Sequence, residues 1–335
     1  MESDIKVSIC CLTYNHEKYI EKTLNGFLMQ MADFKYEIIV HDDASTDSTA
    51  EIVRSFEKKH PDVLHGIYQS ENQYSQKVNI HKQFTLPKLK GKYIALCEGD
   101  DYWTDPYKLQ KQVEALENNT DCFFCVHRVA EVKEDGTKTD VLFPQSNQHT
   151  GKIDSMDFLR MTCAYSFQTS SYMFDGDRWR DYQINPPAFK EVCPVGDEAY
   201  MLYFGGIGRI YYIDDVMSCY RRGVPGSWSK IQNSGDVWRK KVAHYKKMAD
   251  TMRLFDDYTK HKYHKICKKR ELYYLKTVWL LEGTTRTSFR EYLNDIISTL
   301  PLEYIVVLLG AAAFPKLFQK LYIKRLQKIS EKNGY

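Results

Sequence analysis

The chain has 335 residues, of which 43% are hydrophobic and 27% are charged, and this composition is typical of a folded globular protein rather than a disordered or fibrous one. Its nine cysteines are an odd number and fall largely in apolar runs, which favours buried free thiols over a disulfide framework. The first residues lack the features of a secretory signal, and no run of about 18 apolar residues is present, so no membrane-spanning helix is expected. We therefore expect a cytoplasmic protein.

The net charge of +3 is unevenly distributed along the chain. From Asp236 to Tyr335 there are 21 Lys and Arg against 10 Asp and Glu, a net charge of +11, so the residues before Asp236 carry a net charge of −8. A basic C-terminal third on a weakly acidic body predicts an anionic surface as a partner.

The first 130 or so residues alternate apolar runs of β-forming residues with segments of helical periodicity. Strands are predicted at 7–13, 36–40, 64–68 and 93–97, and helices at 20–29, 49–59 and 108–118. This alternation favours an α/β fold with a mostly parallel sheet flanked by helices.

The later segments are more mixed and end in a helical region. Strands are predicted at 122–132, 137–143, 170–174, 209–214 and 216–221, and helices at 155–161, 198–204, 238–255, 265–281 and 289–300. Glu134-Asp-Gly136 is typical of a hairpin turn. Near residue 234 the pattern changes from mixed strand and helix signals to basic amphipathic helices. This change predicts two parts, an α/β domain at 1–234 and a basic helical extension at 235–335.

Polar clusters follow the first two predicted strands. The first cluster contains Thr13, Tyr14 and Asn15, and the second begins with Asp42 and Asp43. Ligands of open parallel sheets bind beyond the carboxyl ends of the strands. A carboxylate at the second cluster would accept hydrogen bonds from a nucleotide base or ribose, although the residues that follow it suit turn and helix-cap chemistry equally well.

The strongest cluster is Glu98-Gly99-Asp100-Asp101, directly after the apolar strand predicted at 93–97. Three carboxylates within four residues at a strand end predict a site for a hard divalent cation such as Mg²⁺ or Mn²⁺, which completes its shell with water and phosphate oxygens. Gly99 allows a tight turn and a close approach of a ligand to the backbone.

A fourth cluster, Gly196-Asp197-Glu198, stands at the start of a predicted helix. One of its carboxylates would serve as a general base that deprotonates a hydroxyl. The residues alone leave open a purely structural role, since acidic side chains at a helix N-terminus stabilise the helix dipole.

In their order and spacing, these segments resemble the family-2 glycosyltransferases of the GT-A fold, of the bacterial surface-polysaccharide type. The resemblance extends over about residues 5–230. The matching segments are 7–15, 37–47, 92–101 and 196–198, followed by Tyr220-Arg221 and 227–229.

The resemblance implies a binding site for a nucleotide-sugar donor, and a UDP-sugar is the donor expected. The base and ribose would be held by Thr13, Tyr14, Asn15, Asp42 and Asp43. Asp100, together with Glu98, would bind the Mn²⁺ or Mg²⁺ ion that bridges the diphosphate. Asp101 would place the donor sugar or its phosphate, and Arg221 or Arg222 would meet the diphosphate.

The resemblance also implies the chemistry and the acceptor side. Asp197 would be the base of an inverting displacement at the anomeric carbon, although Glu198 beside it stays an alternative, and Trp228 would shape the acceptor side. The chain departs from the family at two positions: Glu98 stands where Asp is usual, and Gly223 stands where many relatives carry a His. Because Arg222 is additional, arginine would neutralise the phosphates instead.

The C-terminal region predicts a location at the inner face of the cell membrane. An apolar segment at 304–314 precedes a basic amphipathic segment at 316–328, a pattern that suits a helix lying in a membrane interface. A lipid-linked saccharide or another glycan is therefore the acceptor that we expect, and no nucleic acid partner is expected. Packing of this region on the protein body, or a dimer contact, stays open.

Two other functions stay open. A sugar-phosphate nucleotidyltransferase also uses strand-end carboxylates and a metal, but such enzymes usually carry a Gly-rich loop after the first strand, and residues 14–19 contain no glycine. A non-catalytic nucleotide-sugar-binding or scaffold protein is the second alternative, against which the presence of Asp100 and Asp197 speaks.

Overall fold

The computed structural model of the protein describes residues 4–145, 149–161, 167–225 and 236–332. The chain divides into two compact units. The first unit comprises Met1–Pro186 and Tyr200–Val224, and the second comprises Pro187–Ala199 and Pro225–Tyr335. The second unit thus includes a short segment that precedes the predicted boundary at residue 234.

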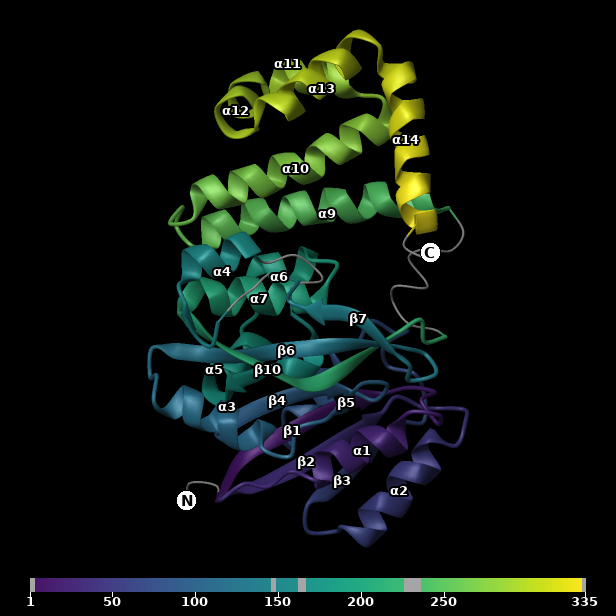
Figure 1. Ribbon diagram of the computed structural model, residues 1–335, viewed down its shortest axis with the longest axis vertical. Helices are drawn as coiled ribbons and strands as arrows, with labels where there is room; N and C mark the ends of the chain where they lie inside the picture. Colours follow the sequence, from purple (N-terminus) through teal and green to yellow (C-terminus); the bar gives the residue numbers. More distant parts are fainter. Residues whose placement is uncertain (1–3, 146–148, 162–166, 226–235, 333–335) are drawn as a thin grey trace. The chain divides into compact units, whose positions relative to one another are not determined.

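A ten-stranded sheet, counted over the described residues, forms the centre of the first unit (Figure 1). Its strands are β1 (Ile5–Thr13), β2 (Lys35–Asp42), β3 (Leu64–Tyr68), β4 (Tyr93–Glu98), β5 (Tyr102–Trp103), β6 (Cys122–Lys133), β7 (Lys138–Phe143), β8 (Gly151–Ile153), β9 (Met173–Asp175) and β10 (Arg209–Arg222). The prediction of an α/β fold with a mostly parallel sheet is confirmed.

The direction of the strands determines where their ends lie. The order is β3-β2-β1-β4-β9-β6-β10-β5, with β7 beside β6 and β8 beside β10. β1 to β4 are mutually parallel, and β9 is antiparallel to both of its neighbours, β4 and β6. Because β6 and β10 are parallel to each other, six strands run in one direction and end at the same edge of the sheet.

Helices pack against this sheet through apolar faces that the sequence spacing anticipates. The helical elements of the first unit are α1 (Ile20–Leu28), α2 (Thr49–Lys59), η1 (His81–Thr85), α3 (Lys108–Glu117), α4 (Ser155–Met161), η2 (Thr169–Ser171), α5 (Gly176–Ile184) and the later part of α7 (Gly196–Ile207). In α1, for example, Ile20, Leu24 and Phe27 are fully buried in the core against the strands, and their spacing places them on one helix face.

The second unit is helical in its described part. Its helices are α6 (Ala188–Val192), the first turn of α7, α9 (Val237–Tyr258), α10 (His264–Glu282), α11 (Thr285–Glu291), α12 (Leu293–Thr299), α13 (Leu302–Ala313) and α14 (Pro315–Lys332). Asp236 caps α9 by accepting a hydrogen bond from the Arg239 N–H at 3.1 Å. Gly283 ends α10 in the left-handed conformation, with φ of 70°, as glycine does at many helix ends. Among the described helices, none combines the length and the apolar character that a bilayer crossing requires.

Four predicted elements differ from the structure. The strands predicted at 209–214 and 216–221 are one strand, β10, whose pairing with β6 shifts register after Ile213 and again after Val216. Asp214 and Asp215 lie in this irregular stretch, which bends the strand without ending it.

The segment predicted as a strand at 170–174 begins with the helical turn η2, and only its last residues enter β9. The single helix predicted at 289–300 is divided between α11 and α12 at Tyr292, whose φ of −104° and ψ of 17° interrupt the helix. In both segments the spacing of apolar residues favours one regular element, but tertiary packing interrupts the regular backbone conformation.

Lys108 in α3 is a fully buried charged side chain beneath the sheet. Its Nζ donates a hydrogen bond to Gln112 Oε1 at 2.7 Å and lies 3.8 Å from the ring centroid of Trp103. Burial lowers the pKa of Lys108 to about 7, because a low-dielectric interior disfavours the ammonium form.

We expect the stability of the protein to depend on pH through Lys108. Between pH 7 and the ordinary lysine value near 10.5 the unfolded chain holds a proton that the folded chain lacks, so the free energy of unfolding rises with pH. Relative to Lys108→Met, the wild type should therefore lose up to roughly 1 kcal/mol per pH unit as the pH falls from 10 to 7.

Urea unfolding of both proteins at pH 7, 8, 9 and 10 measures this difference. Lys58→Met, on the exposed surface of α2, is the control and should follow the wild type. A constant difference between wild type and Lys108→Met over this pH range would show that Lys108 keeps an ordinary pKa.

Candidate functional site

The three predicted strand-end clusters of the first unit meet at one edge of the sheet. β1 lies between β2 and β4, with Thr13 opposite Asp42 and Leu12 opposite Glu98. The backbone continues this pairing beyond the strands, since the Asp43 N–H donates to the Thr13 carbonyl at 3.0 Å and the Gly99 N–H donates to the Leu12 carbonyl at 2.9 Å. Residues far apart in sequence are thereby held side by side.

The loops after β1 and β2 are joined by hydrogen bonds. The Asn15 N–H donates to Ser45 Oγ at 2.9 Å, and Asn15 Oδ1 accepts from the Thr46 N–H at 2.8 Å. Asn15 has a φ of 55°, a conformation that asparagine tolerates better than most residues. Asn15 therefore holds the two loops together, whereas Tyr14 beside it is exposed.

Asp42 and Asp43 are both buried, but they differ in the acceptor capacity that remains to them. Asp43 accepts backbone N–H groups through both oxygens, from Gln73 at 2.8 Å and Tyr74 at 3.0 Å. Asp42 Oδ2 accepts from the Ser45 N–H at 3.0 Å, while its Oδ1 is buried and has no hydrogen-bond partner among the described residues. Of the two, Asp42 has an acceptor atom to spare.

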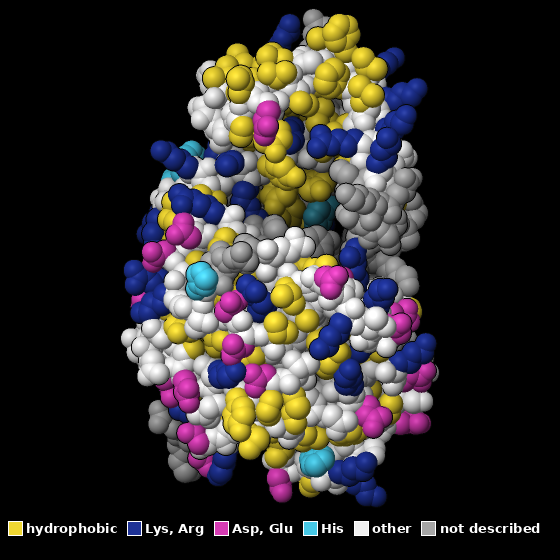
Figure 2. All heavy atoms as spheres, viewed as in Figure 1, with side chains coloured by type: hydrophobic (Ala, Val, Ile, Leu, Met, Phe, Trp, Pro, Cys, Tyr) yellow, Lys and Arg dark blue, Asp and Glu magenta, His cyan; other side chains and the backbone are white. Residues whose placement is uncertain are grey.

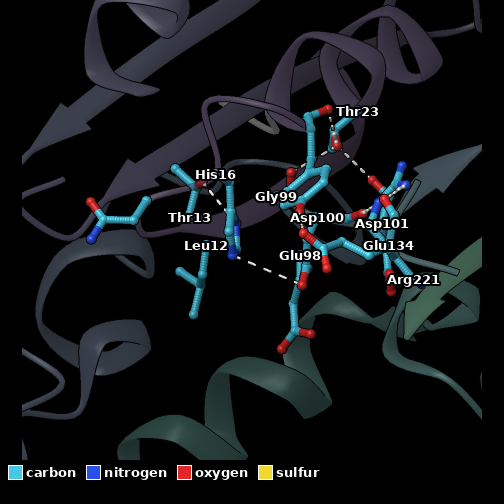
Figure 3. Close-up of polar contacts among 12 residues, drawn as sticks. Leu12, Thr13, His16, Thr23, Glu98, Gly99, Asp100, Asp101, Glu134 and Arg221 are labelled. Atoms are coloured by element: carbon cyan, nitrogen blue, oxygen red, sulfur yellow. Dashed lines mark hydrogen bonds and ion pairs between the residues drawn. The ribbon is translucent and has the colours of Figure 1, made fainter. Parts of the chain in front are cut away.

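Gly99 lies against the end of β1 and allows the loop after β4 to fold onto it. A Cβ atom at Gly99 would lie 2.4 Å from Thr13 Oγ1 and 2.9 Å from His16 Nδ1, so a larger residue would displace both side chains. Thr13 Oγ1 lies 3.2 Å from His16 Nδ1, and His16 Nε2 lies 3.9 Å from Asp100 Oδ2 (Figure 3). His16 was not predicted as a site residue, although its position three residues after Thr13 was a usable signal.

The carboxylates after β4 face different partners. Asp101 is 1% exposed, and its Oδ1 accepts the Arg221 N–H at 2.8 Å. Burial, followed by the negative charges of Asp100 and Glu98, raises the pKa of Asp101 well above its usual range. Asp100 is partly buried beside His16, and Glu98 is exposed at the end of β4.

These residues fit a hard divalent cation. Oxygen ligands from one or two carboxylates are what Mg²⁺ and Mn²⁺ take from a protein when phosphate supplies the rest. Asp100 and Glu98 provide such oxygens. Their negative charges add to burial in raising the pKa of Asp101, which indicates repulsion among the carboxylates of this loop. A bound cation would relieve that repulsion.

The two arginines predicted to meet the diphosphate are engaged elsewhere. Arg221 is 5% exposed, and its guanidinium donates to the carbonyl of Asp100 at 2.9 Å and to that of Glu134 at 2.8 Å. Arg222 Nη1 lies 3.4 Å from Glu131 Oε2. The Arg221 side chain therefore positions the loop after β4 by binding the backbone carbonyl of Asp100. The sequence did not reveal this role.

The predicted base cluster begins α7, within the second unit. Glu198 is fully buried and pairs with Arg270 of α10, whose Nη2 also donates to the Tyr274 hydroxyl at 3.1 Å. Asp197 is partly exposed. Arg270 was not predicted, because nothing in the sequence signals that a basic residue of α10 reaches α7. The predicted acceptor residue Trp228 lies outside the described residues.

Solved structures share this fold at low sequence identity. TarS 1-349 of S. aureus, solved in complex with UDP-GlcNAc, matches with a TM-score of 0.63 and 17% identity over 98% of this chain and 92% of TarS 1-349. The complex of TarS 1-349 with UDP matches with a TM-score of 0.54 and 18% identity over 89% of this chain and 76% of that one. The GT-A fold expected from the sequence is confirmed.

Relatives at higher identity cover part of the chain. Uncharacterized proteins of Mycobacterium bovis and Mycobacterium tuberculosis are 34% identical over 225 residues, which are 66% of this chain and 60% of each relative. TuaG of Bacillus subtilis, named as a glycosyltransferase of teichuronic acid biosynthesis, is 32% identical over 134 residues, 40% of this chain and 50% of TuaG. The matches thus span about half to three fifths of these relatives.

The family model described as Glycosyl transferase family 2 matches residues 8–175. This range begins in β1 and ends with β9, so it contains all three strand-end clusters of the first unit. The chain belongs to glycosyltransferase family 2.

Proposed function

We propose that the protein transfers a sugar from a nucleotide-sugar donor, a UDP-sugar in the first instance, to a hydroxyl of a glycan or lipid-linked saccharide in cell-surface polysaccharide synthesis. The observation that carries this proposal is the meeting of Thr13, Asp42 and the Asp100 loop at one sheet edge. That edge is where open parallel sheets bind nucleotides. The bound UDP and UDP-GlcNAc of the TarS structures support the choice of donor.

The donor nucleotide would bind over β1 and β2. Asp42 offers a buried acceptor for a base or ribose donor group, Tyr14 offers an exposed ring, and Thr13 lines the turn at Gly99. Asn15 and Asp43 would act indirectly, because their polar atoms already hold the surrounding loops. Mn²⁺ or Mg²⁺ would be held by Asp100 and Glu98.

Asp197 is the general base in this proposal. Glu198 is fully buried, and its Oε1 pairs with Arg270, so its carboxylate is withheld from an acceptor. Asp197 is adjacent in sequence and partly exposed, and a base must reach the proton that it removes.

In the proposed step, the acceptor hydroxyl oxygen attacks the anomeric carbon while the bond from that carbon to the phosphate oxygen breaks. The hydroxyl proton passes to Asp197, and the bonding electron pair leaves with the nucleoside diphosphate. A single displacement of this kind inverts the anomeric configuration. A bound divalent cation supplies Lewis-acid stabilisation of the departing diphosphate.

We further propose that the end of the second unit lies on the inner face of the cell membrane. In α13, Leu302, Val306 and Leu309 are at least half exposed, at 75%, 58% and 50%. Figure 2 shows apolar side chains gathered over α11 to α13, with Lys and Arg along α14. A surface that combines exposed apolar residues with basic ones suits an anionic lipid interface.

The first test measures nucleoside diphosphate release from a panel of nucleotide sugars, with Mn²⁺, Mg²⁺ or EDTA. We expect release from one donor, its loss in EDTA, and a decrease of at least about a hundredfold in Asp100→Asn, because a neutral amide binds the cation poorly. Asp177→Asn, at an exposed site in α5, should match the wild type.

Other outcomes would favour the two alternative functions. Metal-dependent donor binding without release or transfer would favour the scaffold. Synthesis of a nucleotide sugar from a nucleoside triphosphate and a sugar phosphate would favour the nucleotidyltransferase.

Asp197 and the ion pair of Glu198 with Arg270 are expected to contribute differently to activity and to stability. Asp197→Asn should reduce transfer by about 10²–10⁴-fold without a change in the free energy of unfolding. Arg270→Met should destabilise the protein by about 3–5 kcal/mol, because it leaves a buried carboxylate unpaired.

The double variant Glu198→Leu/Arg270→Met should recover most of that stability, since it removes both charges. Urea unfolding and transfer assays on the same preparations separate the two roles. A Glu198→Gln protein of wild-type stability but without transfer would assign the base to Glu198 instead.

Membrane association is tested by sedimentation with vesicles. The protein should bind vesicles containing 30% anionic lipid and not neutral ones, and Lys320→Glu/Lys324→Glu in α14 should weaken binding about tenfold or more. Lys58→Glu/Lys59→Glu in α2 makes the same change of net charge and should retain binding. Equal loss in both double variants would reduce the effect to overall charge and contradict the proposed surface.

A further inference from the structure

A second polar site lies in the first unit, next to the Asp100 loop, because Arg221, which donates to the Asp100 carbonyl, also lines it. It is a pocket of about 610 Å³ beyond the carboxyl ends of β6 and β10. The residues that line it include Lys18, Lys22, Lys133, Glu134, Asp135 and Arg221. We call it the Lys22 pocket.

The Lys22 pocket carries an excess of positive charge. Four cationic side chains line it against two carboxylates. Both carboxylates have other partners: Glu134 Oε1 accepts from the Tyr19 hydroxyl at 3.2 Å, and Asp135 Oδ1 accepts from the Thr137 N–H at 2.8 Å. Across the described ranges, Lys18, Lys22 and Lys133 form no ion pair with a carboxylate.

Two of these cations, Lys22 and Arg221, lie close enough for their charges to repel each other. Lys22 Nζ lies 3.8 Å from the ring centroid of Tyr102, which fixes the ammonium group over the aromatic face. Burial, followed by the positive charges of Arg221 and Lys138, lowers the pKa of Lys22. A bound anion would stabilise the positive charge that the two carboxylates of the lining do not neutralise.

The wall of the pocket is rigid. The guanidinium carbon of Arg221 lies 4.7 Å from the ring centroid of Tyr19, and the same side chain holds the carbonyls of Glu134 and Asp100. The turn after β6 is therefore fixed to the loop after β4 through one buried arginine. An anion in the Lys22 pocket would lie next to the reacting centre, with Arg221 between it and the metal ligands.

The lining residues distinguish this pocket from the donor site. Lys18, Tyr19 and Lys22 follow β1, whereas Lys133, Glu134 and Arg221 lie at the ends of β6 and β10. None of the residues proposed to hold the donor nucleotide or its metal is among the lining residues. In the proposed function, a donor bound over β1 and β2 would therefore leave this pocket to the acceptor.

We propose that the Lys22 pocket binds a phosphate group of the acceptor, as a monoester or a diester close to the hydroxyl that is glycosylated. This proposal rests on the proposed glycosyl transfer and narrows its acceptor to a phosphate-bearing saccharide or polyol. Three lysines provide donors for phosphate oxygens without the planar geometry that arginine imposes.

The test uses glycerol 3-phosphate as the probe, titrated by calorimetry into the full chain with Mn²⁺ and UDP present. We expect binding, and we expect Lys22→Ala/Lys133→Ala to weaken it about tenfold. Lys58→Ala/Lys59→Ala removes the same charge from α2 and should bind as the wild type does. Lys22→Arg/Lys133→Arg should restore binding, which excludes a loss through misfolding.

A parallel titration with UDP and Mn²⁺ tests whether the pocket binds the acceptor phosphate or the donor nucleotide. Donor binding in Lys22→Ala/Lys133→Ala should change less than twofold, and saturating UDP should not displace the probe. Displacement by UDP, or an equal loss of UDP and probe, would give the pocket to the donor and overturn the proposal, as would unchanged probe binding in the variant. Probe binding by a protein that releases no nucleotide in the donor panel would contradict the proposed function and leave the phosphate site intact.

Discussion

The hydrogen bond from the Arg221 N–H to the buried Asp101 carboxylate is the contact on which this site depends. It joins the loop after β4 to the end of β10, and the Arg221 side chain returns to the carbonyl of Asp100. A buried carboxylate is costly unless it accepts hydrogen bonds and lies near a cation, and Arg221 supplies both. With Asp101 turned inward, Asp100 is left facing His16 and the nucleotide side.

The predicted ligand residues fall into two groups, according to whether their polar atoms are already hydrogen-bonded within the protein. Asn15, Asp43 and Arg221 use their polar atoms to hold neighbouring loops in place. Asp42 and Asp100 retain capacity for a ligand. Asp42 has a buried oxygen without a hydrogen-bond partner among the described residues. An oxygen of Asp100 lies 3.9 Å from His16, which forms no ion pair with another carboxylate in the described chain. Residues of the first group fix the geometry of the second, so substituting either group would impair binding, for different reasons.

The sequence predicted the fold well where burial on both sheet faces produces continuous apolar runs. The residues of 93–97 are such a run, and the acidic cluster after them is placed by the strand itself. The sequence predicted the strand boundaries poorly where a strand contains an irregular stretch. Asp214 and Asp215 suggest a loop between two strands, yet β10 passes through them by shifting register against β6. Pairing along a 12-residue neighbour decides this outcome, and no local propensity records it.

The strand-end residues of the site could be predicted from the sequence. The residues that hold them in place, such as Arg221, could not. Thr13, Asp42 and Asp100 are each marked by a preceding strand, because parallel strands end at one edge. Arg221 acts on a loop about 120 positions earlier, and Arg270 acts on Glu198 from 72 positions later. Such pairs join elements whose spacing along the chain carries no information about contact. The family resemblance located the candidate residues, whereas their contacts in the folded chain indicate which of them hold neighbouring loops in place.

The distribution of charge around Arg221 adds a constraint on substrates. Up to residue 235 the chain is acidic overall, with a net charge of −8. Three lysines that form no ion pair with a carboxylate among the described residues nevertheless line one pocket, at the end of β6 and the start of α1. In an acidic body, carboxylates are abundant enough that neighbouring lysines would usually meet one, as Lys111 meets Asp105 and Asp215. In the proposed arrangement, Arg221 would lie between two anionic ligands: a diphosphate drawn to a cation at Asp100, and a second anion drawn to Lys22. Under the proposed function, that second anion is a phosphate group of the acceptor.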